Sequence, residues 1–193
     1  MLGGTFDPVH NGHLILAQHA CDQLALDLAL FIPAGEPWRK AHRPITPAQH
    51  RLAMLELAIA GNDAFGISDI ELRRAGPTYT ADTLEALAAE RLDDEFFFVV
   101  GTDALADLPN WHEPERIIQH ATLAVAGRGD TPAETAMRAL PELKARMVRF
   151  DMPAVAVSST EIRARVASRR DISAMVPAGV ARYIVEHGLY VGS

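Results

Sequence analysis

The stretch from Gly3 to Leu14 reads Gly-Gly-Thr-Phe-Asp-Pro-Val-His-Asn-Gly-His-Leu, and it decides the fold. The glycine pair allows backbone geometry that a Cβ would forbid, and Pro8 ends any preceding strand because it cannot donate to a strand ladder. Apolar residues with helical spacing follow, so Asn11 or Gly12 is expected to open a helix. A strand, a glycine turn and a helix N-terminus form a seat for phosphate, since free N–H groups and the helix dipole point at it.

Beyond this stretch the chain alternates short apolar runs with amphipathic segments. The expected strands are 28–32, 65–72, 96–100, 122–126, 147–150 and 154–157. The expected helices are 46–60 behind a capping box, 80–92, a short one from 102, 113–119, 131–146 with an interruption or restart at Pro141, 158–168 and 180–187. This alternation predicts one α/β domain over 1–193, a Rossmann-like doubly wound parallel sheet with helices on both faces. Ligands of such sheets bind beyond the carboxyl ends of the strands.

Composition narrows the classes of function. The 193 residues are 49% apolar and carry a net charge of −7, which argues against a general nucleic-acid surface. No apolar run is long enough for a membrane span, and no secretory signal is visible. The single cysteine, Cys21, excludes an internal disulfide and favours a cytoplasmic protein. The sequence leaves open whether the chain is a monomer or a homo-oligomer.

Eleven consecutive residues, Gly3-Gly4-Thr5-Phe6-Asp7-Pro8-Val9-His10-Asn11-Gly12-His13, resemble the signature of the nucleotidylyltransferase superfamily. The match is most similar to the bacterial nicotinate-nucleotide adenylyltransferases, and it continues in order to about Tyr190. Members of that branch join nicotinate mononucleotide to the AMP part of ATP, with release of pyrophosphate, in NAD biosynthesis. The resemblance therefore implies a nucleotidyltransferase with ATP and nicotinate mononucleotide as substrates and Mg²⁺ on the ATP phosphates.

His10 and His13 lie three residues apart at the start of the first helix. The resemblance implies that both donate to ATP phosphate oxygens and stabilise charge in the transition state. A metal site is a weaker interpretation, because two ligands are too few and no nearby Cys or carboxylate completes a set. Two ordinary surface histidines are the third.

The segment Val157-Ser158-Ser159-Thr160-Glu161-Ile162-Arg163 resembles the family's Ile-Ser-x-Thr-x-Ile-Arg. In that reading Ser158 and the helix N-terminus donate to the β- and γ-phosphates, and Arg163 adds a cation, so the helical part 158–190 completes the ATP site. A plain capping box with a surface arginine is the alternative. The implied ATP site comprises Gly3, Gly4, Thr5, Phe6, His10, His13, Ser158, Thr160 and Arg163, of which His10, His13 and Arg163 are the candidate catalytic residues.

Two further segments resemble the family's mononucleotide side. The loop Ala34-Gly35-Glu36-Pro37-Trp38-Arg39-Lys40 carries a basic residue for the mononucleotide phosphate, with Lys40 preferred over Arg39 and His42. Gly76-Pro77-Thr78-Tyr79-Thr80-Ala81-Asp82-Thr83 resembles a segment whose backbone groups beside the threonine bind the pyridine carboxylate, so Tyr79 and Thr80 are implied. A solvated basic loop and a simply well-capped helix are the alternatives.

Asp103 and Trp111 complete the implied mononucleotide site. Asp103 follows the apolar strand 96–100, where the family places an aspartate on a ribose hydroxyl. Trp111 offers an aromatic plane for stacking the pyridine ring, although a partly buried core tryptophan is the alternative. The family's arginine-proline-glycine turn appears here as Arg128-Gly129, without the proline.

The expected mechanism is direct in-line attack of the mononucleotide phosphate on the α-phosphorus of ATP. A phosphate monoester is largely ionised near neutral pH, so it needs no side-chain base, and no covalent intermediate is expected. Two alternatives stay open. A pantetheine-phosphate adenylyltransferase shares the first motif, but that branch usually has threonine in place of His10 and lacks the Tyr79–Thr83 segment. A non-catalytic nucleotide-binding regulator would keep the pocket without turnover.

Overall fold

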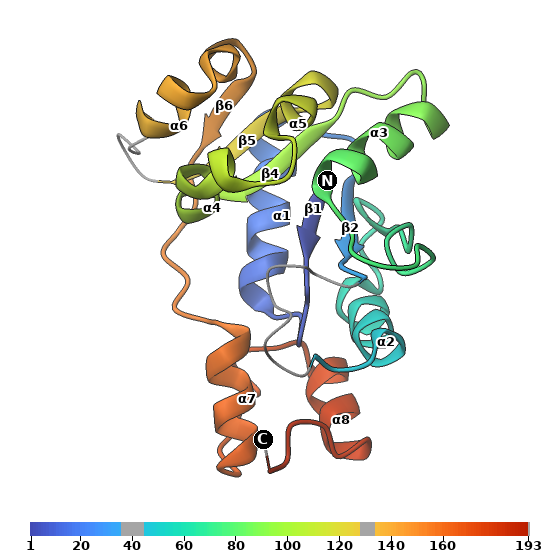
Figure 1. Cartoon of the computed structure of the whole chain (residues 1–193). Helices are drawn as coiled ribbons and strands as arrows, with labels where there is room; N and C mark the ends of the chain where they lie inside the picture. Colours follow the sequence, from blue (N-terminus) through green and yellow to red (C-terminus); the bar gives the residue numbers. More distant parts are fainter. Residues whose placement is uncertain (36–44, 128–133, 193) are drawn as a thin grey trace.

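The computed structural model of the chain describes residues 1–35, 45–127 and 134–192. Within them lie the strands β1 (Leu2–Gly4), β2 (Ala29–Pro33), β3 (Phe65–Ile67), β4 (Phe97–Gly101), β5 (Thr122–Ala126) and β6 (Met147–Phe150). The helices are α1 (Asn11–Leu24), α2 (Ala48–Ile59), α3 (Thr80–Glu90), α4 (Thr102–Asp107), α5 (Pro114–His120), α6 (Glu134–Ala139), α7 (Ser159–Ala167) and α8 (Ala178–Glu186). Two short 3₁₀ helices span Leu108–Asn110 and Pro141–Ala145 (Figure 1).

The strands are parallel and doubly wound, as the alternating pattern predicts. β1, β2 and β3 pair in that order, and so do β4, β5 and β6. The two halves meet at β1 and β4, where the Val99 N–H donates to the Met1 carbonyl at 2.9 Å. The order across the molecule is therefore β3-β2-β1-β4-β5-β6, and the chain reverses its direction of winding between β1 and β4. Such a switch point is where ligands of this fold bind.

Neighbouring residues on each strand point into opposite cores. On β2, Phe31 packs into a cluster with α1, α2, α7 and α8, whereas Leu30 and Ile32 pack into a second cluster with α3, α4 and α5. On β4, Val99 belongs to the first cluster and Phe98 to the second. The period-two alternation of side chains along a strand thus gives the sheet two buried faces, which explains why its strands read as continuous apolar runs.

The glycine pair does not form the turn after β1, as the sequence had suggested, but lies inside this strand. The turn comes later, at Phe6, whose φ of 49° places a non-glycine residue in the left-handed region. Gly4 is needed for space, because a Cβ there would come within 3.0 Å of the Phe6 ring. α1 begins at Asn11, as predicted.

Several predicted boundaries are wrong. α2 begins at Ala48 behind Pro47, one residue later than expected, and no side chain caps it. The Thr46 carbonyl accepts a hydrogen bond from Arg51 Nε at 2.9 Å. The expected strand 65–72 ends at Ile67, and the stretch 154–157 is not a strand. The interruption expected at Pro141 is confirmed, because the stretch forms α6 and then a separate 3₁₀ helix that begins at Pro141.

Side chains of the C-terminal part of the chain hold the loop between β1 and α1 through hydrogen bonds. The Tyr190 hydroxyl donates to Oδ1 of Asp7 at 2.9 Å, and Asp7 is only 2% exposed. Arg163 Nη1 donates to the Asp7 carbonyl at 2.6 Å, and the Ser159 hydroxyl donates to the Pro8 carbonyl at 2.9 Å. In Figure 1, α7 and α8 lie below the end of β1 that carries this loop. None of the described helices is both long and apolar enough to cross a membrane.

Tyr190→Phe is expected to destabilise the fold by about 1–3 kcal/mol, because it takes a donor away from the buried Asp7 carboxylate. Urea unfolding, with a midpoint read by circular dichroism, measures the change. Val191→Ala is the matched control, since Val191 is 64% exposed and its truncation should change stability by less than about 0.5 kcal/mol. Equal midpoints for the Tyr190→Phe variant and the wild type would contradict a stabilising role of the hydrogen bond between Tyr190 and Asp7.

Candidate active site

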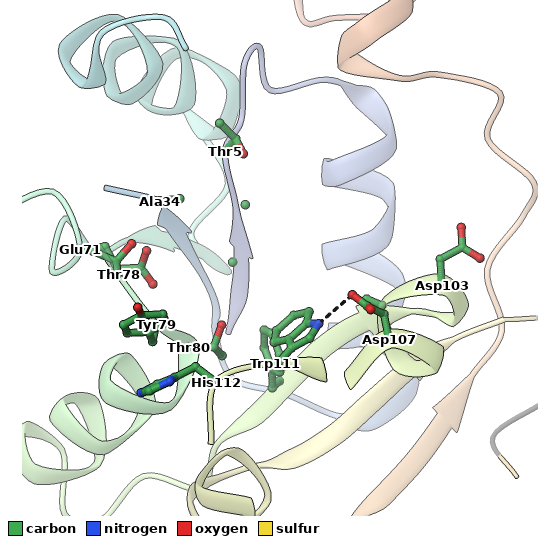
Figure 2. A pocket seen from close by; sticks show the side chains of 14 residues that line it. Thr5, Ala34, Glu71, Thr78, Tyr79, Thr80, Asp103, Asp107, Trp111 and His112 are labelled. Atoms are coloured by element: carbon green, nitrogen blue, oxygen red, sulfur yellow. Dashed lines mark hydrogen bonds between the residues drawn. The ribbon is translucent and has the colours of Figure 1, made fainter. Parts of the chain in front are cut away.

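A cavity of about 490 Å³ opens at the switch point, beyond the carboxyl ends of β1, β2 and β4 (Figure 2). It is lined by Gly3, Gly4, Thr5, Ala34, Glu71, Thr78, Tyr79, Thr80, Phe98, Asp103, Ala104, Asp107, Trp111 and His112. Its walls come from the end of β1, the segment before α3, and the helical turns after β4. The cavity is large enough for a small-molecule ligand.

Aromatic rings line two parts of this cavity. Tyr79 stacks on the His112 ring with the centroids 4.0 Å apart. Trp111 is half-buried, its Nε1–H donates to Asp107 Oδ2 at 3.3 Å, and its ring meets Phe98 edge-on at 5.9 Å. The hydrogen bond to Asp107 fixes the indole plane within the cavity. Rings held in this way suit a flat aromatic ligand.

The N-terminus of α3 supplies the donors on the adjoining wall. Tyr79 is the N-cap residue in extended conformation, Thr80 is the first helical residue, and no side chain caps the helix. The first backbone N–H groups of a helix have no partner within it, so they favour an anion. Asp82 in the same turn would oppose an anion, but its carboxylate pairs with Arg116 at 3.1 Å. This helix end therefore suits a ligand carboxylate.

The charged side chains that line the cavity are acidic. Glu71, Asp103 and Asp107 contribute carboxylates, and no described lining residue is a lysine or arginine. Asp103 lies in the first turn of α4, directly after β4, and is exposed. An exposed carboxylate there can accept hydrogen bonds from ligand hydroxyl groups. An anionic ligand must consequently use the backbone donors of α3 in this part of the cavity.

His10 and His13 lie next to each other at the start of α1, outside the cavity. Their rings stack with centroids 3.7 Å apart, and the His10 backbone N–H donates to His13 Nδ1 at 3.2 Å. In a neutral His13 that accepting nitrogen leaves the proton on Nε2, which is then a donor. The Phe6 ring meets the His13 ring edge-on at 4.9 Å and helps to hold it.

His10 is buried, and burial lowers its pKa to about 4. It is therefore neutral at pH 7 and acts through a single N–H rather than through a full positive charge. Its Nδ1 is buried and has no hydrogen-bond partner among the described residues. Gly12 lies so close that a Cβ would come within 3.0 Å of this nitrogen, so the glycine leaves space for the ring.

The start of α7 lies against the same loop. Ser158 caps the helix by accepting from the Glu161 N–H at 3.1 Å, which confirms half of the predicted capping box. The Glu161 carboxylate does not complete the box but pairs with Arg165 at 3.0 Å. Arg163 contacts the Asp7 carbonyl and, at 3.3 Å, Thr160 Oγ1. Arg163 is thus directed toward the loop that carries both histidines.

The predicted residues form two groups that meet at β1. Tyr79, Thr80, Asp103 and Trp111 share the cavity with Gly3, Gly4 and Thr5. His10, His13, Ser158, Thr160 and Arg163 gather around the loop after β1, whereas Phe6 is buried beneath it. Lys40, Arg39, His42 and the turn Arg128-Gly129 lie outside the described residues. In the described part of the chain, no three His, Cys, Asp or Glu side chains gather as a metal site.

Four polar side chains of the cavity were not predicted from the sequence, namely Glu71, Thr78, Asp107 and His112. Thr78 lies within a segment that was singled out, and His112 is adjacent to Trp111. The sequence does not indicate Glu71 and Asp107 as site residues, because single carboxylates outside a motif are usually solvated surface residues. Their position in the cavity depends on how the segments pack.

Comparisons with known proteins agree with this geometry. Residues 1–165 match the family model described as cytidylyltransferase-like. A probable nicotinate-nucleotide adenylyltransferase of Thermomicrobium roseum is 46% identical over 98% of this chain and 90% of its own, and one of Symbiobacterium thermophilum is 43% identical over 99% and 94%.

Solved structures share the fold at low sequence identity. The Plasmodium falciparum nicotinic acid mononucleotide adenylyltransferase complexed with NaAD superposes with a TM-score of 0.80 at 20% identity, covering 98% of this chain and 95% of that one. The fold, the motifs and the level of identity to these relatives lead to one assignment. The chain belongs to the cytidylyltransferase-like family, in its nicotinate-nucleotide adenylyltransferase branch.

Proposed function

We propose that the chain transfers the adenylyl group of ATP to nicotinate mononucleotide, giving deamido-NAD and pyrophosphate in NAD biosynthesis. One observation carries the proposal: a cavity with aromatic walls and a helix N-terminus adjoins, across the end of β1, a loop beside which lie two histidines at the start of α1 and an arginine of α7. Two nucleotides bound on either side of β1 would meet there through their phosphates. The relatives named for this activity align with almost the whole chain.

The cavity is assigned to the mononucleotide. Tyr79 and Trp111 bind the pyridine ring, the first N–H groups of α3 at Thr80 donate to its carboxylate, and Asp103 accepts a hydrogen bond from a ribose hydroxyl. The mononucleotide phosphate then points toward β1. Lys40, outside the described residues, is assigned to that phosphate on the resemblance alone.

The loop after β1 and the start of α7 are assigned to Mg-ATP. Gly3, Gly4, Thr5 and Phe6 form the backbone beside the α-phosphate. His10 and His13 donate hydrogen bonds to its oxygens. Ser158, Thr160 and Arg163 bind the β- and γ-phosphates. Mg²⁺ enters with ATP, because this ion keeps several waters and is commonly held through substrate phosphates. The helical part 158–190 thereby completes the ATP site of one nucleotidylyltransferase domain.

The reaction needs positioning more than acid–base chemistry. A phosphate oxygen of the mononucleotide forms a bond to the α-phosphorus of ATP while the bond to the bridging oxygen breaks, and Mg-pyrophosphate leaves with the electron pair. The attacking phosphate is already ionised near pH 7, so no proton has to be removed. Holding both nucleotides in line can contribute about 7–11 kcal/mol to lowering the barrier. We place the enzyme in the cytoplasm, where the buried thiol of Cys21 stays reduced.

Pyrophosphate release from Mg-ATP, measured with nicotinate mononucleotide, its amide counterpart and phosphopantetheine in parallel, tests the proposed function. Release is expected to be fastest with the nicotinate form, because its carboxylate meets the N–H groups of α3. Release with phosphopantetheine alone would overturn the assignment in favour of a pantetheine-phosphate adenylyltransferase. Binding of the mononucleotide without release would point to a regulator.

His13→Ala is expected to lower kcat by about 10²–10³-fold, since it removes a donor that acts on the transition state. The KM for nicotinate mononucleotide should change far less, because His13 lies outside the cavity assigned to that substrate. Steady-state kinetics measure both quantities. His19→Ala in the same helix is the control, because the His19 ring contacts Gln23 instead of the loop. Equal losses in turnover and mononucleotide binding would refute this role of His13.

A further inference from the structure

A buried carboxylate, that of Glu71, lies in the wall of the cavity beside the first turn of α3. Glu71 is only 8% exposed, and its Oε1 accepts a hydrogen bond from the Thr83 hydroxyl at 2.9 Å. Thr83 is completely buried in the first turn of α3, and Arg74 Nη1 lies 3.4 Å from its oxygen. Because arginine can only donate, the single proton of the Thr83 hydroxyl points away from Arg74, toward Glu71 Oε1 or toward the Tyr79 carbonyl at 3.1 Å. The carboxylate oxygen is the nearer and the stronger acceptor of the two.

Glu71 also holds the neighbouring segments through its backbone. Its carbonyl accepts the Arg74 N–H at 3.3 Å and closes a turn. The same carbonyl packs so closely on Gly35, just after β2, that a Cβ on this glycine would lie 2.4 Å from it. Glu71 therefore connects the end of β2 with the N-terminus of α3, and Figure 2 shows it beside Thr78 on the same side of the cavity.

The surroundings identify Glu71 as an acceptor for the protein rather than as a group that binds the anionic substrate. A carboxylate that faced the pyridine carboxylate directly would repel it. Thr83 instead donates a hydrogen bond to one carboxylate oxygen of Glu71. This hydrogen bond holds the turn of α3 whose backbone N–H groups open onto the cavity. Thr78, the other buried hydroxyl of this wall, has no hydrogen-bond partner among the described residues. The hydrogen bond between Glu71 and Thr83 is thus a specific contact that holds the N-terminus of α3.

We propose that Glu71 is a positioning residue that, through Thr83, holds the first turn of α3 in place to receive the acidic group of the substrate. The inference rests on the proposed function for the identity of that substrate. Glu71 thereby contributes to the preference for nicotinate mononucleotide, which carries an acid, over its amide counterpart. A displaced helix end would lose directed donors for the carboxylate, while the ATP loop on the far side of β1 would be unaffected.

Four variants separate this role from general stability. Glu71→Leu and Thr83→Val remove the hydrogen bond, whereas Glu71→Gln and Thr83→Ser keep an acceptor and a donor. The first pair should raise the KM for nicotinate mononucleotide by about tenfold, as one lost hydrogen bond predicts, with kcat and the KM for Mg-ATP changed less than about threefold. The conservative pair should stay within about threefold of the wild type. The double variant Glu71→Leu/Thr83→Val should be no worse than either single one.

Hydrogen exchange gives a second readout that needs no substrate. The Thr83 amide, which donates to the Tyr79 carbonyl at 3.1 Å, and the hydrogen-bonded amides of the next turn of α3 should exchange faster in Glu71→Leu and Thr83→Val, and at the wild-type rate in the conservative pair. Unchanged exchange and an unchanged KM in Glu71→Leu would overturn the proposal, as would a parallel loss of kcat and of both KM values. If the wild type released no pyrophosphate with nicotinate mononucleotide, the proposed function would fail, and exchange alone would decide the role of Glu71.

Discussion

The path of the chain from β1 into α1 is the constraint on which the rest of the structure depends. Within a few residues the backbone leaves a buried strand, passes a left-handed Phe6 and enters a helix. Donors from separate elements hold it there: Arg51 of α2 on the Thr5 carbonyl, Ser159 and Arg163 of α7 on Pro8 and Asp7, and Tyr190 on the Asp7 carboxylate. Such charged and buried hydrogen bonds are stronger than exposed ones, so the loop is fixed from several directions.

This constraint places one loop between the two proposed ligand sites. β1 lies at the switch point, so its carboxyl end faces the cavity on one side and the histidine pair on the other. A loop fixed by the last helices makes the C-terminal part of the chain a component of the site, although it lies outside the parallel sheet. Preorganised donors of this kind are the main source of catalysis where the reaction itself needs no base.

Strong local signals made much of this predictable. Short, mainly apolar runs identified β5 and β6 to the residue, and the motifs placed Tyr79, Thr80, Asp103 and Trp111 in one cavity. The errors arose where tertiary contacts override local chemistry. Thr46 contacts Arg51 through its carbonyl and does not cap α2, and the glycine pair serves close packing inside a strand. Glu71 could not be predicted, because its role comes from a contact with Thr83, twelve residues away.

The most direct measurement of the central claim is a crystal structure of the chain with deamido-NAD bound. The account predicts the pyridine ring in the cavity lined by Tyr79 and Trp111, its carboxylate at the first N–H groups of α3, and the adenylyl phosphate beside His10 and His13. A dinucleotide bound in the opposite direction, with adenine in that cavity and the pyridine ring near α7, would contradict the assignment of the two sides of β1.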